Sequence, residues 1–130
     1  MKRFDGKVAL VTGASRGIGR AIAAMLAAQG ATVVAAARGD NAQATVEAIR
    51  TAGGRAEALA LDVTNADAAV AAVQGVVATH GRLDILVSNA GITRDQLMLR
   101  MKRADWDEVI ATNLTAAFVL CQAALKPMVK

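Results

Sequence analysis

The stretch Thr12-Gly13-Ala14-Ser15-Arg16-Gly17-Ile18-Gly19-Arg20 directly follows the apolar run Val8-Ala9-Leu10-Val11. A buried strand, a glycine-rich turn and a helix in succession are typical of a site that binds phosphate through backbone N–H groups. Gly13, Gly17 and Gly19 leave room for a pyrophosphate to approach the main chain, and the positive end of the helix dipole faces the anion. This stretch therefore predicts a phosphate-binding turn.

Apolar runs of strand length alternate with amphipathic stretches of helix length along the whole chain. We expect strands at Lys7–Thr12, Thr32–Ala37, Ala56–Leu61 and Leu83–Ser88, and helices at Gly17–Gln29, Ala42–Ala52, Ala66–Thr79 and from Arg103-Ala104-Asp105 toward the carboxyl end. Thr64 or Asn65 can cap the third helix. Because strands joined by helices form right-handed crossovers, the pattern predicts a parallel sheet with helices on both faces.

The composition fits one α/β domain and argues against several other classes. The chain has 130 residues, of which 55% are hydrophobic and 20% charged, as in a compact globular domain. A net charge of +4 without clustering, and 2% aromatic residues, do not predict nucleic-acid binding. Cys121 is the single cysteine, so no internal disulfide forms, and we expect it to be a small buried residue. No metal site is expected, because Asp105, Asp107 and Glu108 fit the first turn of a helix.

The sequence carries no predicted membrane or export signal. No apolar run approaches the ~20 residues of a membrane span. The first residues, Met1-Lys2-Arg3-Phe4-Asp5, turn polar at once, unlike a signal peptide. We therefore expect a cytoplasmic protein with no membrane partner.

Four separated motifs resemble the short-chain dehydrogenase/reductase family, most closely the 3-oxoacyl-[acyl-carrier-protein] reductases of fatty acid biosynthesis. They are the Gly-x-x-x-Gly-x-Gly turn, Leu61-Asp62-Val63-Thr64, Ser88-Asn89-Ala90-Gly91-Ile92-Thr93-Arg94-Asp95, and Trp106 through Asn113-Leu114. One departure is Ser88, where many members carry an asparagine. The resemblance implies a Rossmann-like three-layer α/β/α half-fold, with a parallel sheet of about four strands in the order 3-2-1-4.

The same resemblance implies the residues of a dinucleotide site. The glycine turn would hold the pyrophosphate and the adenosine ribose, Asp62 and Val63 would border the adenine, and three small or amide residues would lie beside the ribose. The implied cofactor-binding residues are Gly13, Ser15, Arg16, Gly17, Ile18, Gly19, Asp62, Val63, Asn89, Ala90 and Gly91.

The charge that follows the second strand bears on the choice of cofactor. NAD sites usually place a carboxylate there for the ribose 2′-hydroxyl, whereas this strand ends Ala35-Ala36-Ala37-Arg38. The guanidinium of Arg38 can hold a 2′-phosphate through paired hydrogen bonds, and Arg16 favours the same ligand. We therefore predict NADP(H), unless Asp40 rather than Arg38 reaches the ribose.

The chain contains no tyrosine. In the family a tyrosine transfers the proton to or from the carbonyl, a lysine four residues later lowers its pKa, and a serine orients the substrate. Asn113 matches the fourth catalytic residue, which helps to hold a water in the proton relay, but Lys126 and Lys130 do not match the lysine by position. We therefore expect residues 1–130 to form a single truncated dinucleotide-binding domain that lacks the catalytic half and is inactive alone.

Three interpretations stay open. The chain is the NADP(H)-binding half of a 3-oxoacyl-[acyl-carrier-protein] reductase, or an enzyme that works once a complementary half supplies the tyrosine and lysine. Alternatively, it is an engineered or reconstructed half-fold that self-associates without useful cofactor binding. The edge of the strand at Leu83–Ser88 and the apolar last helix would lack neighbours, so we expect a homodimer or larger assembly through either or both. The acyl carrier protein is an implied partner only of the full-length family.

Overall fold

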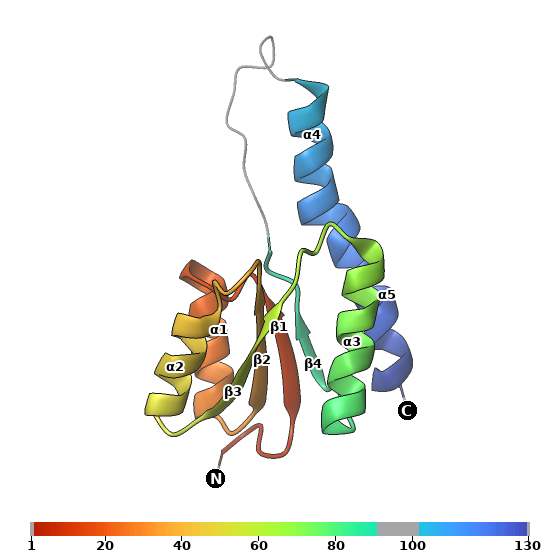
Figure 1. The fold of residues 1–130 in the computed structure, drawn as a ribbon. Coiled ribbons are helices and arrows are strands. Elements are labelled where there is room, and N and C mark those ends of the chain that lie inside the picture. Colours follow the sequence, from red (N-terminus) through yellow and green to blue (C-terminus); the bar gives the residue numbers. More distant parts are fainter. Residues whose placement is uncertain (1, 91–101, 130) are drawn as a thin grey trace.

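The computed structural model describes residues 2–90 and 102–129, and a four-stranded parallel sheet lies at its centre (Figure 1). The strands are β1 (Val8–Thr12), β2 (Thr32–Ala37), β3 (Arg55–Ala60) and β4 (Ile85–Val87). The helices are α1 (Gly17–Ala28), α2 (Gln43–Thr51), α3 (Ala66–His80), α4 (Arg103–Ile110) and α5 (Ala116–Met128), with a π-helical turn, η2 (Ala111–Thr115), between the last two.

The strands lie in the order β3-β2-β1-β4, which confirms the predicted order. Val8 pairs with Thr32 and Thr12 with Ala36 in the parallel register of β1 and β2. On its other side β1 pairs with β4, with Leu10 opposite Leu86. All four carboxyl ends therefore meet at one edge of the sheet, where the glycine turn lies.

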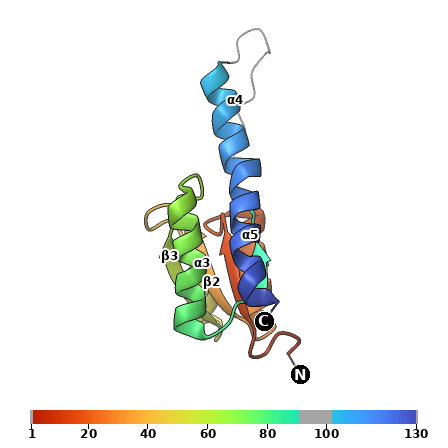
Figure 2. The same cartoon turned by 90° about the vertical axis from the view of Figure 1, so that its right-hand side faces the viewer.

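Helices cover both faces of the sheet. Helices α1 and α2 lie on one face, and α3 and α5 lie side by side on the other (Figures 1 and 2). Strand β1 contributes side chains to the cores on both faces of the sheet. Ala9 and Val11 pack beneath α1 and α2. Val8 and Leu10 pack beneath α3 and α5. The fully apolar strands predicted from the sequence therefore form a sheet that is buried on both faces.

Strand β4 is shorter than the predicted Leu83–Ser88, and the side chain of Asp84 explains why. The N–H of Asp84 donates to the carbonyl of Val8 at 2.9 Å, but the N–H of Val8 donates to the Asp84 carboxylate, also at 2.9 Å. The Asp84 side chain thus takes the place of the backbone carbonyl that would accept from Val8 in a regular parallel sheet. The same carboxylate forms an ion pair with Arg82, whose Nε lies 2.7 Å from Oδ2.

The last helix begins at Arg103 and runs to Met128, as predicted. Helices α4 and α5 and the π turn form one continuous helix, and its α4 end extends well beyond the sheet (Figure 2). At 26 residues, Arg103–Met128 is long and apolar enough to cross a membrane by length and composition. The expectation that no apolar stretch reaches that length was therefore wrong, although core helices of soluble proteins meet the same criterion.

Cys121 is exposed, which corrects the prediction that it is buried. The buried face of the last helix consists of Ala116, Leu120 and Ala124, which pack with residues of α3. Cys121 follows Leu120 by one residue and therefore points away from that face. The cap of α3 does match a prediction, because the Asn65 side chain accepts a hydrogen bond from the N–H of Ala68 at 3.1 Å.

We predict that Asp84→Ala lowers the free energy of unfolding by about 1.5–3 kcal/mol, the usual contribution of hydrogen bonds to a charged group. Hydrogen bonds from the Arg82 side chain, above all, lower the pKa of Asp84. Its contribution is therefore complete above the unfolded pKa of about 3.9 and is lost as the pH falls through the lower folded pKa.

Urea unfolding at several pH values checks this prediction, with the exposed Asp40→Ala variant as the control. The deficit of Asp84→Ala should shrink in acid, while Asp40→Ala should stay within about 0.5 kcal/mol of the parent at each pH. A deficit that is independent of pH would contradict the role assigned to the carboxylate.

Candidate functional site

The glycine turn between β1 and α1 packs backbone against backbone. Gly13 has φ +62°, and a Cβ added there would lie 2.9 Å from the backbone N and Cα of Ala90. A Cβ added to Gly19 would collide with the carbonyl oxygen of Gly13. The turn, the start of α1 and the segment that follows β4 can therefore approach this closely only because two residues have no side chain.

Thr12 joins the ends of the two central strands. Its side chain is fully buried, and Oγ1 accepts hydrogen bonds from the N–H groups of Asn89 at 2.9 Å and Ala90 at 3.1 Å. The hydroxyl also donates to the carbonyl of Val87 at 3.4 Å, and the Asn89 amide donates to the carbonyl of Gly13 at 3.4 Å. These bonds fix the segment after β4 against the glycine turn.

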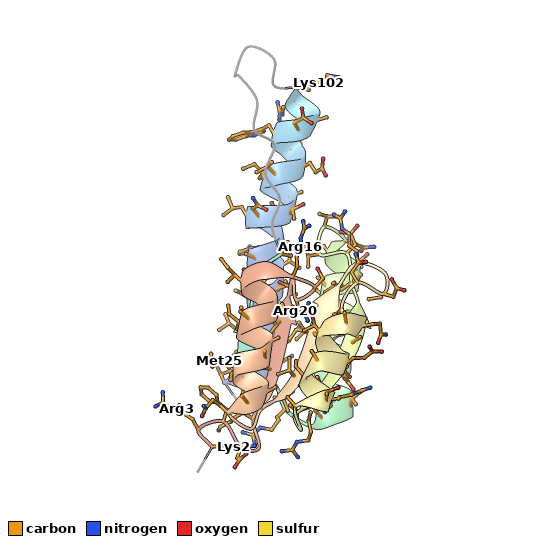
Figure 3. All side chains as sticks on the ribbon, turned by 90° about the vertical axis from the view of Figure 1, so that its left-hand side faces the viewer. Lys2, Arg3, Arg16, Arg20, Met25 and Lys102 are labelled. Carbon is orange, nitrogen blue, oxygen red and sulfur yellow. The ribbon has the colours of Figure 1, made fainter. Side chains whose placement is uncertain are left out.

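A pocket of about 410 Å³ opens at this edge of the sheet. Arg16 lies at the same end of α1, one helical turn before Arg20 (Figure 3). Most of the residues predicted to bind the cofactor line this pocket: Gly13, Ser15, Arg16, Gly17, Ile18, Arg38, Val63, Asn89 and Ala90. It is also lined by Ala36, Ala37, Asn41, Leu61 and Thr112.

Three of the predicted residues that the structure describes are not part of the lining. Gly19 lies behind the turn, where it contacts the carbonyl of Gly13. Asp62 sits between two lining residues and is itself exposed. Asn113 is exposed in the π turn beside Thr112, and Gly91 lies outside the described residues.

Arg38 and Asp62 face each other at the rim of the pocket. Arg38 Nη2 lies 3.7 Å from Asp62 Oδ1, and both side chains are more than half exposed. Hydrogen bonds from the Thr64 side chain and backbone N–H, followed by attraction to Arg38, lower the pKa of Asp62, so this carboxylate is ionised at neutral pH. An exposed pair at this distance contributes about 0–1 kcal/mol, so a doubly charged phosphate can compete for the guanidinium.

Thr112 is the lining residue of most interest that the sequence did not reveal. It is 4% exposed, and its Oγ1 has no hydrogen-bond partner among residues 2–90 and 102–129. Buried hydroxyls are normally satisfied, so an unpaired one in a pocket wall indicates a place where a ligand or water can bind. Thr112 could have been suspected from the sequence because it adjoins Asn113. Its place in a π turn could not, because a π turn has no sequence pattern of its own.

A larger pocket, of about 810 Å³, lies between the end of α3 and the end of α5. Its lining includes Leu83, Lys126 and the Arg82–Asp84 pair, and it contains none of the predicted cofactor residues. The smaller pocket is therefore the candidate site, because it combines the glycine turn, two arginines and an unpaired hydroxyl.

The strand order and the helices on both faces of the sheet define a Rossmann-like half-fold. The family description "short chain dehydrogenase" matches residues 7–130, and the chain belongs to the short-chain dehydrogenase family. It is 48% identical over 128 residues to the 3-oxoacyl-[acyl-carrier-protein] reductase FabG of Escherichia coli K12, and 48% identical over 126 residues to that of Staphylococcus aureus Mu50. These matches cover 98% and 95% of this chain but 51% of each relative, so the chain spans about half the length of these curated relatives and corresponds to their amino-terminal half.

Solved structures show the same correspondence. A metagenomic short-chain oxidoreductase in complex with NADP superposes with a TM-score of 0.93 at 46% identity, covering 97% of this chain and 58% of the other. A short chain dehydrogenase from Burkholderia cenocepacia J2315, also in complex with NADP, gives 0.92 at 43% identity, covering 97% and 52%. The last helix lies within the matched residues, as a normal part of the family fold.

Two buried threonines should respond in opposite ways to replacement by valine. Thr112→Val removes an unpaired hydroxyl and should raise the free energy of unfolding by about 1 kcal/mol. Thr45 Oγ1 donates to the carbonyl of Ala14 at 2.8 Å, so Thr45→Val should lower it by about 1–3 kcal/mol. Urea unfolding of the two variants checks both signs, and a destabilised Thr112→Val protein would contradict the unpaired hydroxyl.

Proposed function

We propose that this chain binds NADP(H) and forms the cofactor half of a 3-oxoacyl-[acyl-carrier-protein] reductase. One observation carries the proposal: the glycine turn, Arg16 and Arg38 all line the same pocket. Solved structures of related short-chain dehydrogenases in complex with NADP support it by similarity. We place the protein in the cytoplasm on the same grounds of similarity.

The glycine turn supplies the pyrophosphate site. Arg16 precedes α1 in an extended conformation and has no side-chain hydrogen bond to the helix end, so its guanidinium can turn toward the pocket. The first N–H groups of α1, from Gly17 and Ile18 onward, have no partner within the helix and suit an anion. The close approach of Gly13 to Ala90 fixes the far wall of this site.

Arg38 is the residue we assign to the 2′-phosphate. Its exposed pairing with Asp62 holds the guanidinium at the rim of the pocket. Asp62 then stays close enough to border the adenine, and Thr112 adds a hydroxyl-bearing residue to the lining. Asn41 also lines the pocket and can add a hydrogen bond through its amide.

We further propose that the chain alone does not reduce a carbonyl. NADPH supplies the hydride when it is bound, but the chain has no tyrosine to transfer the proton. A missing general acid costs about 10²–10⁴-fold in rate. Asn113, the fourth catalytic residue implied by the family, is exposed in the π turn, where it can meet groups that a complementary half would supply.

Titration of the chain with NADPH, followed by the fluorescence of the reduced nicotinamide, tests cofactor binding. We expect saturable binding, tighter for NADPH than for NADH, and Arg38→Ala should weaken NADPH binding by about 10–100-fold, the cost of hydrogen bonds to a charged group. Arg55→Ala is the matched control, because Arg55 is exposed at the amino end of β3, away from the pocket. Thr112→Val should weaken binding by a few-fold while raising stability.

Three outcomes separate the interpretations. Absence of saturable binding would contradict the cofactor half and favour a fold that binds no cofactor. Equal affinities for NADPH and NADH, unchanged in Arg38→Ala, would contradict the 2′-phosphate assignment alone. Reduction of an acetoacetyl thioester by the isolated chain would contradict its inactivity, whereas activity that appears only after addition of a complementary half would support a split enzyme.

A further inference from the structure

The pocket of about 810 Å³ lies at the end of the domain opposite the glycine turn. Its walls come from the carboxyl ends of α3 and α5 and from the segment that leads into β4, and we call it the α3–α5 pocket. Figure 1 shows these helix ends at the edge of the sheet where the strands begin. Among the described residues it shares no lining with the candidate cofactor site. Its volume is in the range of small-molecule sites, about 300–1,000 Å³.

One part of this lining is apolar and continuous with the core. Val73 and Leu83 are 1% and 2% exposed, and both belong to the core cluster beneath α3 and α5. Val77 and Ala123 are partly buried and pack against the same cluster, and Pro127 also lines the pocket. Apolar walls in an open pocket are in contact with water, and a hydrocarbon ligand that displaces this water gains free energy.

The charged side chains of the pocket leave one positive charge uncompensated. Arg82, Asp84 and Lys126 are the charged residues of the described lining. Arg82 donates two hydrogen bonds to the Asp84 carboxylate, at 2.7 and 2.8 Å, so these two charges balance. Lys126 is exposed and has no ion-pair partner among residues 2–90 and 102–129. Its ammonium group is therefore the charge that a ligand would meet.

Arg82 can still donate hydrogen bonds although its charge is balanced. Its guanidinium has five N–H groups, and the Asp84 carboxylate accepts from Nε and Nη2. The carboxylate itself is held in place, because Asp84 Oδ2 also accepts from the N–H of Val8 at 2.9 Å. The remaining N–H groups of Arg82 are left for water or a ligand.

The helix ends limit how much negative charge a ligand can carry. Both α3 and α5 end at this pocket, and each carboxyl end carries about half a negative charge. A nucleotide or a phosphate dianion would be repelled by both ends. A single carboxylate needs one cation, and the ammonium of Lys126 stands on a flexible four-carbon stem, beyond the last turn in which the dipole acts.

We propose that the α3–α5 pocket binds a small amphiphilic monocarboxylate. Its hydrocarbon tail lies against Val73, Val77 and Leu83, where the lining is apolar. Its carboxylate accepts charge-assisted hydrogen bonds from Lys126 and Arg82. The proposal does not depend on cofactor binding, because the two pockets have separate linings and lie at opposite edges of the sheet.

Isothermal titration calorimetry with hexanoate, octanoate and decanoate, each below its micellar concentration, tests the proposal. We expect saturable binding, with a dissociation constant that falls about 3–4-fold for each added methylene group as more of the tail is buried. Octanamide has the same tail without the charge, so it should bind several-fold more weakly than octanoate. Inorganic phosphate should not bind at the same concentrations.

A charge-removing variant tests the head group. Lys126→Met keeps a long apolar side chain and removes the ammonium, so it should weaken octanoate binding by about 3–10-fold and leave octanamide binding unchanged. Lys102→Met is the matched control, because Lys102 is exposed at the other end of the same long helix (Figure 3). It should bind both compounds like the parent.

A pocket-filling variant tests the location. Ala78 is exposed on α3 and lines the pocket, so Ala78→Trp should place a ring in the binding space and abolish saturable octanoate binding. Ala71→Trp is the control, since Ala71 is exposed on the same helix outside the lining. Thermal unfolding should show that both proteins fold. In amide NMR spectra of the parent, octanoate should shift signals of residues 73–84 and 123–128 and leave those of the glycine turn in place.

The outcomes separate this proposal from the cofactor site. Absence of octanoate binding by the folded parent would overturn it, as would an affinity that ignores tail length or survives Ala78→Trp. Binding to anionic phospholipid vesicles without binding of monomeric octanoate would assign the surface to a membrane and overturn it as well. NADPH binding that is normal in Ala78→Trp, together with loss of octanoate, would support two independent sites.

Discussion

The hydroxyl of Thr12 is the point at which the sheet and the candidate site are joined. It is fully buried and binds the ends of two strands that are 75 or more residues apart in sequence. The N–H groups of Asn89 and Ala90 would otherwise be left without partners at the end of β4, a cost of about 1–3 kcal/mol each. Gly13 can then lie directly against Ala90 because it has no side chain. One threonine and one glycine thus set the wall of the pocket.

In the function that we propose, cofactor binding is separate from proton transfer. The groups that suit a phosphorylated dinucleotide come from the loops at the carboxyl ends of β1, β2 and β4, all within the described part of the chain. The proton-transfer group of the family is a tyrosine, and this sequence has none.

The features that could be predicted from the sequence are those encoded by a short, continuous stretch of residues. The glycine turn, the alternation of strands and helices, and the four motifs predicted the strand order and most of the pocket lining. The features that it missed depend on the third dimension. The carboxylate of Asp84 takes the place of a backbone acceptor for the N–H of Val8, and Thr112 lies buried in a π turn. Neither feature leaves a pattern that periodicity can detect, because the first joins residues 76 positions apart and the second is an irregularity within a helix.

The close approach of Gly13 to Ala90 is tested most directly by adding one methyl group. Gly13→Ala should lose about 1–3 kcal/mol of stability, since the residue would be both strained at φ +62° and in collision with backbone, and it should lose NADPH binding. Gly75→Ala, in the middle of α3 with open space around it, should gain about 0.5–1 kcal/mol and bind NADPH normally. A Gly13→Ala protein that is as stable as the parent and binds NADPH equally well would contradict the account.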